Sequence, residues 1–239
     1  MNERNKAKEF EKGFSYGKGV IPTPGDWISY FWDTHRNKIM KSLENPLDRA
    51  DSILFVGVGS GDILPSLNLG GKTVFGIDLN LRFLVRAAGC CHAVAADSAM
   101  LPFKNNYFDM VVCNMVLHHV VGQGGLENTI AECSRVLRRG GRLLAFEPNL
   151  FHPSGMALTL LNRFHLYHRI GGGSDYEYPL SPLRLRKICR LHFKRVELKA
   201  ITFSHPRFPV FIQKLFFRLD ARLRNIYPLS FSFMTEAVK

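Results

Sequence analysis

Apolar and polar positions change places in blocks along residues 51–150, and each block has the length of one strand or one helix. Short apolar runs typical of strands occupy 53–58, 73–79, 92–97, 107–116 and 142–147. Residues with helical spacing lie between them, at 81–88 and 124–138. This alternation predicts a single α/β domain: an open, mostly parallel sheet with helices on both faces.

The chain on either side of this block carries further elements. Residues 26–44 have helical spacing and begin with Asp26 as a plausible N-cap. A helix starting at residue 62 is weakened by Pro65. Gly140 after two arginines suggests a left-handed helix end at 138. After an irregular stretch, the pattern predicts a helix at 182–191, a strand at 193–201, a helix at 209–224 and a final strand at 231–239.

Composition fits this reading. The chain has 239 residues, which suits one large α/β domain. It contains no apolar run long enough to cross a membrane. The first residues are charged and have no apolar core behind them, so we expect no signal peptide. Five cysteines without CxxC spacing predict reduced, mostly buried thiols and a cytoplasmic location.

The positive charge is unevenly distributed. The formal net charge is +12, and residues 151–239 hold fifteen Lys and Arg against five Asp and Glu. Such asymmetry suggests an acidic or phosphorylated partner, an anionic membrane face or nucleic acid. A solvated basic surface explains it equally well.

The strand at 53–58 runs into three glycines, Gly57, Gly59 and Gly61. A dinucleotide fingerprint would need another glycine at the sixth position of the motif, where this chain has Asp62. Asp78 ends the next strand, and a carboxylate there can accept both hydroxyl groups of a ribose. The turn therefore predicts a nucleotide-type ligand without deciding which one.

The later strands narrow the choice. ILFVGVGSGD, VFGIDLN, AADSAMLPFKNNYFDMVVCNMVLHHV and RVLRRGGRLLAFEPN follow one another across 53–149. In this order they resemble the class I S-adenosylmethionine-dependent methyltransferases, in the broad group that includes ubiquinone- and menaquinone-biosynthesis methyltransferases. The resemblance implies a Rossmann-like sheet of seven strands with the last antiparallel, and S-adenosylmethionine as cofactor with S-adenosylhomocysteine as product.

The resemblance also implies roles for individual residues. The three glycines would let the backbone approach the amino-acid part of the cofactor. Further positions would surround the rest of it: Asp78 the ribose hydroxyls, Leu79 the adenine ring, Asp97 the adenine amino group, Ser98 beside it, and Asn114 the methionine part. Phe55 departs from the family, which usually has an acidic residue there. Asp62 or the N-terminal segment could substitute for that carboxylate.

Three residues near the predicted acceptor side are candidates for catalysis. His118 and His119 follow the fourth strand, and one of them could remove a proton from the acceptor or orient it. Equally, the pair could only pack under the next loop. Glu147 ends the fifth strand, where it could be a catalytic acid or, alternatively, a cap or ion-pair partner. No histidine or cysteine group has the spacing of a metal site.

From these elements we expect residues 1–50 to form a helical cap over the cofactor and 51–239 the methyltransferase domain. Within the domain, 148–180 would be an insertion or lid, and 181–239 a basic part that completes the sheet. The expected acceptor is a small or lipid-like molecule, and an anionic acceptor would suit the basic C-terminal part. Peripheral membrane contact through 209–224 is one interpretation of its apolar face and basic border, and packing on the core is the favoured one. RNA methylation and a non-catalytic cofactor-binding subunit are the alternatives.

Overall fold

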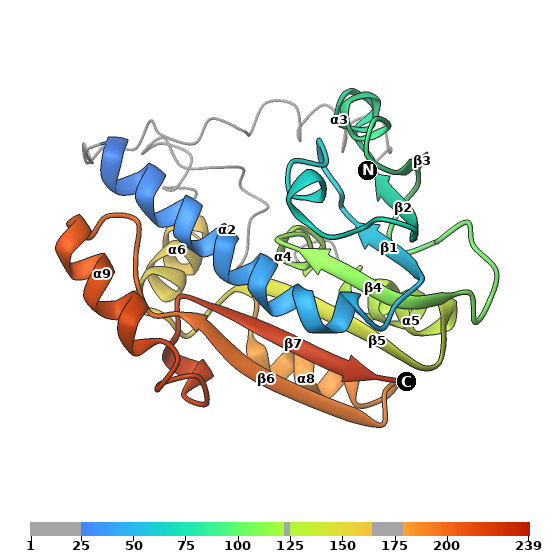
Figure 1. The fold of residues 1–239 in the computed structure, drawn as a ribbon. Helices are drawn as coiled ribbons and strands as arrows, with labels where there is room; N and C mark the ends of the chain where they lie inside the picture. The colour runs from blue at the N-terminus through green and yellow to red at the C-terminus, as the bar shows by residue number, and fades with distance from the viewer. Residues whose placement is uncertain (1–24, 122–124, 164–178) are drawn as a thin grey trace.

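A single seven-stranded sheet organises the molecule (Figure 1). The computed structural model describes residues 25–121, 125–163 and 179–239. The strands are β1 Ser52–Val56, β2 Thr73–Asp78, β3 His92–Ala95, β4 Phe108–Asn114, β5 Leu137–Pro148, β6 Arg195–Thr202 and β7 Ser232–Val238. Their order is β3-β2-β1-β4-β5-β7-β6, and β7 runs antiparallel to both of its neighbours. The predicted sheet, with its last strand antiparallel, is confirmed.

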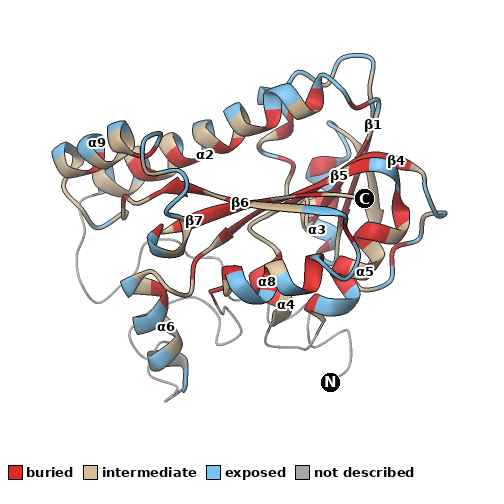
Figure 2. Cartoon of the chain, turned by 90° about the horizontal axis from the view of Figure 1, so that it is seen from below, coloured by how far each residue is buried: buried red, intermediate tan, exposed pale blue. Residues whose placement is uncertain are grey.

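Helices cover both faces of the sheet (Figure 2). The helices α4 Leu117–Val121, α5 Leu126–Val136 and α8 Pro182–Cys189 lie on one face, and α2 Gly25–Leu47 crosses the other. An apolar core lies on each face of the sheet, and alternate residues of a strand point into one core or the other. In β1, Leu54 and Val56 pack with α5, whereas Ile53 and Phe55 pack with α2.

The helix α2 buries one residue in each turn. Phe31, His35, Ile39, Leu43 and Leu47 are buried at a spacing of four, which is the stripe that a helix needs to lie flat on a sheet. The part of the predicted cap that the structure describes is therefore a sheet-covering helix, and residues 1–24 lie outside the described residues. Neither observation tests the proposed cover over the cofactor.

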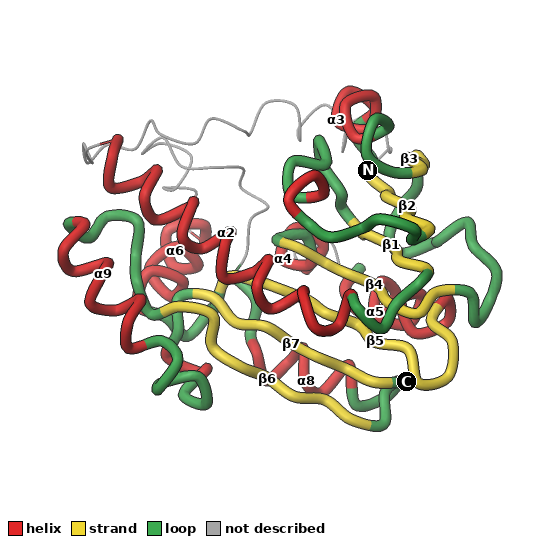
Figure 3. Tube along the Cα trace, viewed as in Figure 1, coloured by secondary structure: helices red, strands yellow, loops and turns green. Residues whose placement is uncertain are grey.

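Two local predictions are wrong (Figure 3). The helix expected after Asp62 is a single 3₁₀ turn, Leu64–Ser66, with Pro65 in its first turn, and the chain is extended at Leu67. The helix α5 ends at Val136, since Leu137 already has extended dihedral angles and pairs with Phe108. Gly140 therefore lies inside β5, where a φ of +78° accompanies a shift in register against β4.

The irregular stretch leaves the sheet and returns to it at one point. Leu180 N donates to Pro148 O (2.9 Å), and Leu150 N donates to Leu180 O (3.1 Å). Between these bonds lie α6 Pro153–Arg163 and residues 164–178, which are outside the described residues. The remaining elements are α3 Leu81–Ala87, α9 Val210–Leu219 and the 3₁₀ turn Tyr227–Leu229. In the parts of the chain that the structure describes, no helix has the length and apolar character of a membrane span.

Candidate functional site

The glycine turn after β1 has a backbone that only glycine adopts easily. The φ angles of Gly57, Gly59 and Gly61 are +66°, +56° and +77°. A Cβ atom on Gly57 would lie 2.3 Å from Cγ2 of Val116, whereas a Cβ on Gly59 would have no heavy atom of the described residues within 4 Å. The turn is therefore packed against the protein at Gly57 and opens outward at Gly59.

Asp78, at the end of β2, holds the open part of this turn. Its Oδ2 accepts a hydrogen bond from Gly59 N, and its Oδ1 accepts one from Asn80 N, both at 2.9 Å. Leu79 is 42% exposed beside it. The carboxylate expected to contact a ligand thus also fixes the backbone that would contact the same ligand.

Asn114 is the last residue of β4. The Oδ1 atom of its side-chain amide is buried and has no hydrogen-bond partner among the described residues. The next residue, Met115, has a φ of +54°, which is strained for a residue with a side chain. An unsatisfied buried acceptor costs about 1–3 kcal/mol, so a donor supplied by a ligand would relieve it.

The other predicted cofactor residues form hydrogen bonds with neighbouring residues of the protein. Asp97 Oδ1 accepts from Ala99 N (2.8 Å), and Ser98 Oγ lies 3.0 Å from the hydroxyl of Thr129. Asp62 is exposed and accepts from Ser60 Oγ (2.6 Å). Because β1 to β4 are parallel, the residues that follow them all lie at one edge of the sheet.

Phe55 has a structural role. It is 3% exposed and lies in the apolar core under α2. No carboxylate stands where the family usually has one. Asp78 instead supplies the hydrogen bond that holds Gly59.

Glu147 is fully buried and accepts several hydrogen bonds. Its Oε1 accepts from Val116 N and Leu117 N (3.1 and 2.8 Å), and its Oε2 accepts from His118 N (3.2 Å). Oε2 also lies 2.8 Å from His118 Nδ1. This carboxylate caps the start of α4 and orients a histidine, which fits the cap alternative rather than direct contact with a substrate.

The two neighbouring histidines have different surroundings. Both are buried, and their ring centroids are 4.0 Å apart. Burial, with a smaller effect of His118, lowers the pKa of His119 to about 2. His119 is therefore a neutral imidazole at physiological pH, while His118 faces a carboxylate.

Sequence reasoning missed a second pair of histidines on the acceptor side. The rings of His152 and His205 stack 6.0 Å apart at 8°, and each packs edge-on against Phe231. Phe231 is bonded to the ends of β5 and β6 through Asn149 N and Thr202 O. Burial lowers the pKa of both histidines, to about 4 for His205. The repeated His-Pro pairs at 152–153 and 205–206 were the available signal.

No group of three or more His, Cys, Asp or Glu side chains in the described part of the chain could hold a metal ion.

Comparison with known families and sequences gives one consistent result. A family model described as "Methyltransferase domain" matches residues 54–145. A ubiquinone/menaquinone biosynthesis C-methyltransferase of Erwinia tasmaniensis is 31% identical over 156 residues. That alignment covers 57% of this chain and 61% of the relative, so the chain spans about three fifths of that protein's length.

Solved structures share the fold. An S-adenosylmethionine-dependent methyltransferase of Thermotoga maritima superposes with a TM-score of 0.65 at 15% identity, covering 87% of this chain and 93% of that one. Magnesium protoporphyrin IX methyltransferase of Synechocystis, solved with bound S-adenosylhomocysteine, gives 0.57 at 18% identity, covering 87% and 84%. At these identities the likeness concerns the fold alone.

Proposed function

Because residues 54–145 form a methyltransferase domain of the class I, S-adenosylmethionine-dependent type, we propose that the protein transfers a methyl group from this cofactor to a small or lipid-linked acceptor. One observation carries the proposal: the positive-φ turn that opens at Gly59 is held by Asp78. Backbone exposed in this way can approach a ligand closely, which a turn filled by side chains could not.

The residues at this edge fit the cofactor. The unsatisfied Oδ1 of Asn114 could accept a hydrogen bond from the amino group of the methionine part. Asp78 and Asp97 end neighbouring strands, where they would receive the ribose hydroxyls and the adenine amino group. Leu79, half exposed between them, would cover the adenine ring. Asp62, Ser98 and the three glycines complete the proposed set.

Bound S-adenosylmethionine supplies a methyl group already activated by a positively charged sulfur. The protein therefore has to align the acceptor, exclude water and, for some acceptors, remove a proton. We assign proton removal to His118. Its Nδ1 is held by Glu147, so Nε2 is the nitrogen left for the acceptor, and the buried carboxylate stabilises the charge that the imidazole gains.

His119 is proposed to position the acceptor instead. A pKa of about 2 leaves the ring neutral and makes it a poor proton acceptor at pH 7. Its contact with His118, 4.0 Å between the ring centroids, would keep the two rings in one arrangement. Glu147 would act on the acceptor only through His118.

The acceptor is proposed to lie next to Phe231 at the ends of β5 and β6. Depressed pKa values keep His152 and His205 mostly neutral at pH 7, so this wall is aromatic and uncharged. A flat, apolar ring system would pack against such a wall. This supports an aromatic or lipid-linked acceptor over a highly charged one.

The helix α9 supports proposed contact with a lipid surface. It packs on α2 through Gln213, which donates to Trp27 O, and through Phe217, which contacts Phe31. Phe211 and Leu215 on its apolar face are 73% and 56% exposed. Outward apolar side chains bordered by basic ones are typical of an interfacial helix.

Two measurements test this proposal. Calorimetry should detect S-adenosylmethionine and S-adenosylhomocysteine but not NAD. Labelled methyl groups should then enter a small-molecule or lipid fraction of an extract, and anionic vesicles should increase transfer if the acceptor is lipid-linked. NAD binding alone would disprove the cofactor, and label confined to RNA would disprove the acceptor class.

With the acceptor known, His118→Gln should reduce turnover by about 10²–10⁴-fold, the usual contribution of a general base. Affinity for S-adenosylhomocysteine should not change. His119→Gln should mainly raise KM. Equal turnover of the His118 variant and the unmodified protein would remove His118 from catalysis.

A further inference from the structure

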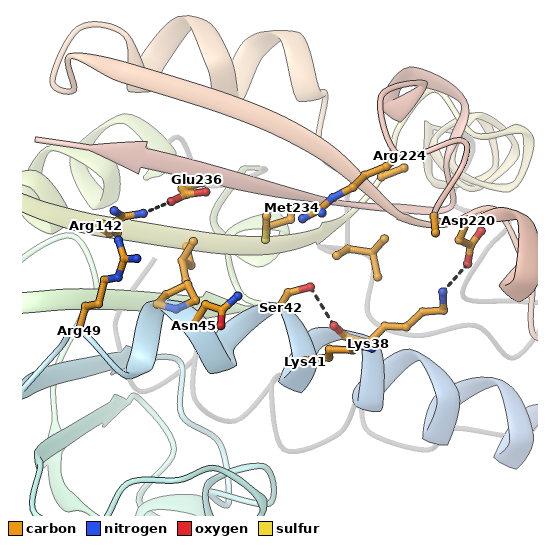
Figure 4. A pocket seen from close by; sticks show the side chains of 15 residues that line it. Lys38, Lys41, Ser42, Asn45, Arg49, Arg142, Asp220, Arg224, Met234 and Glu236 are labelled. Carbon is orange, nitrogen blue, oxygen red and sulfur yellow. Dashed lines mark hydrogen bonds and ion pairs between the residues drawn. The ribbon is translucent and has the colours of Figure 1, made fainter.

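A groove lies between α2 and the β5–β7–β6 part of the sheet, apart from the proposed methyl-transfer site (Figure 4). Its volume is about 600 Å³, within the usual range of small-ligand sites. Its lining comes from α2 and the turn after it, from β5 to β7 and from the segment after α9, and it includes none of the residues assigned above to the cofactor or acceptor. It is therefore a second candidate site.

The groove is strongly basic. Five cations line it against two carboxylates, a net charge of +3; the cations are Lys38, Lys41, Arg49, Arg142 and Arg224. The two carboxylates are already paired. Asp220 Oδ2 lies 2.9 Å from Lys38 Nζ, and Glu236 pairs with Arg142.

Three of the cations have no carboxylate partner among the described residues. Lys41, Arg49 and Arg224 are exposed, and their side chains make no ion pair or hydrogen bond there. Figure 4 shows the two ion pairs at opposite ends of the groove and Arg224 reaching in between them. Like charges gathered in a concave wall repel one another, and a bound anion would relieve that repulsion.

The floor of the groove is apolar. Leu144, Ile201 and Met234 line it between the charged walls, and all three are buried. Guanidinium groups pair with phosphate oxygens in a bidentate manner, and an apolar floor favours a ligand with an apolar or aromatic body. An inorganic anion has no apolar body and would make no favourable contact with this floor.

We propose that this groove binds an organic diphosphate, with the diphosphate between Arg49, Arg142 and Arg224 and the organic body against Met234. The same chemistry occurs in nucleoside diphosphates and in prenyl diphosphates. A groove of about 600 Å³ matches the size of a small ligand, which favours a small molecule over a nucleic-acid strand lying along a surface.

The test is calorimetric titration at constant ionic strength with inorganic pyrophosphate, ADP, geranyl diphosphate and a 20-nucleotide RNA. ADP or geranyl diphosphate should bind at least tenfold more tightly than pyrophosphate, and the tighter of the two identifies the organic body. The double variant Arg49→Glu/Arg224→Glu should weaken that binding at least tenfold. Lys41→Glu, a single exposed change, should weaken it in the same direction.

The matched control is Lys187→Glu/Lys194→Glu, which changes the net charge equally at exposed positions outside the groove. Unchanged affinity for S-adenosylhomocysteine shows that each variant is folded. The proposal is overturned by equal binding of pyrophosphate and both organic ligands, by no binding at all, or by equal losses in the groove and control variants. Tightest binding of RNA, lost in the groove variant, overturns it in favour of nucleic acid.

Discussion

The glycine-turn edge and the basic groove are built in opposite ways. The edge combines the backbone of one turn, residues 57–61, with side chains that end or directly follow β2 to β5. The groove is made of side chains from α2 and the turn after it, from β5, β6 and β7, and from the segment after α9, far apart along the chain. Residues placed at strand ends have a recognisable sequence pattern, whereas a site assembled from distant side chains has none.

Replacing one carboxylate in each region, fully buried in the first and partly exposed in the second, should sharpen this contrast most. Glu147→Gln should lower the free energy of unfolding by about 3 kcal/mol, because an amide group would face backbone donors in a buried site. Glu236→Gln, in the half-exposed pair with Arg142, should cost less than about 1 kcal/mol. Urea unfolding measures both. Similar losses would mean that the groove is as tightly determined as the edge.

Acid should affect two buried histidines, one on each face of the sheet, over different ranges. Burial, with a smaller effect of Lys38, lowers the pKa of His35 to about 4, while that of His119 falls to about 2. An unfolded histidine titrates near 6.5, so the unfolded state takes up protons first and stability decreases as the pH falls below that value. The loss from His35 ends near pH 4, whereas the loss from His119 continues to about pH 2.

Between pH 7 and pH 5, each of these histidines should lower the free energy of unfolding by about 2 kcal/mol. His35→Gln should remove that part of the loss, and the amide can still bond to Ser232. His119→Gln should do the same on the other face of the sheet, and His192→Gln, at an exposed position, is the control. Unfolding curves at pH 7, 5 and 3.5 provide the measurement. Unchanged pH dependence in both buried variants would contradict the buried neutral state.

The smallest expected effect separates backbone strain from ligand contact. Gly59 and Gly140 both have positive φ and open space around a Cβ, but only Gly59 belongs to the proposed cofactor edge. Alanine at either position should cost about 1 kcal/mol of stability. Only Gly59→Ala should also weaken S-adenosylhomocysteine binding, by about tenfold in calorimetry. Equal affinity of the two variants for S-adenosylhomocysteine would show that the cofactor does not contact this turn.

The sequence predicted the sheet, its central strands and the residues at their ends because each depends on local spacing. The helix limits were less predictable. The true end of α5 depends on Leu137 pairing with Phe108, a contact that no helical pattern contains. Likewise, the apolar pattern of α9 does not indicate which side packs, since the buried residue there is Gln213, which donates hydrogen bonds to two carbonyl groups.

The candidate site divides in the same way. Positions taken from the family pattern lie at one edge of the sheet, as expected, and their roles remain predictions. The sequence left Glu147 between catalysis and capping, and the cap depends on contacts with Val116, Leu117 and His118, about thirty residues away, which no local pattern contains. The groove could not have been predicted, because the partners of Arg142 and Lys38 lie more than ninety residues away in each case.

The order of the strands in the sheet determines which strands can pair first during folding. The strand β6 has only β7 as a neighbour, and β7 follows it after α9 and a further turn. During synthesis β6 must therefore remain unpaired until β7 has left the ribosome, while β1 to β5 can already form a sheet. Non-local pairing of this kind is slow. The wall of the groove formed by β6 and β7 is therefore completed last. A newly made chain could bind its proposed cofactor before the groove is complete.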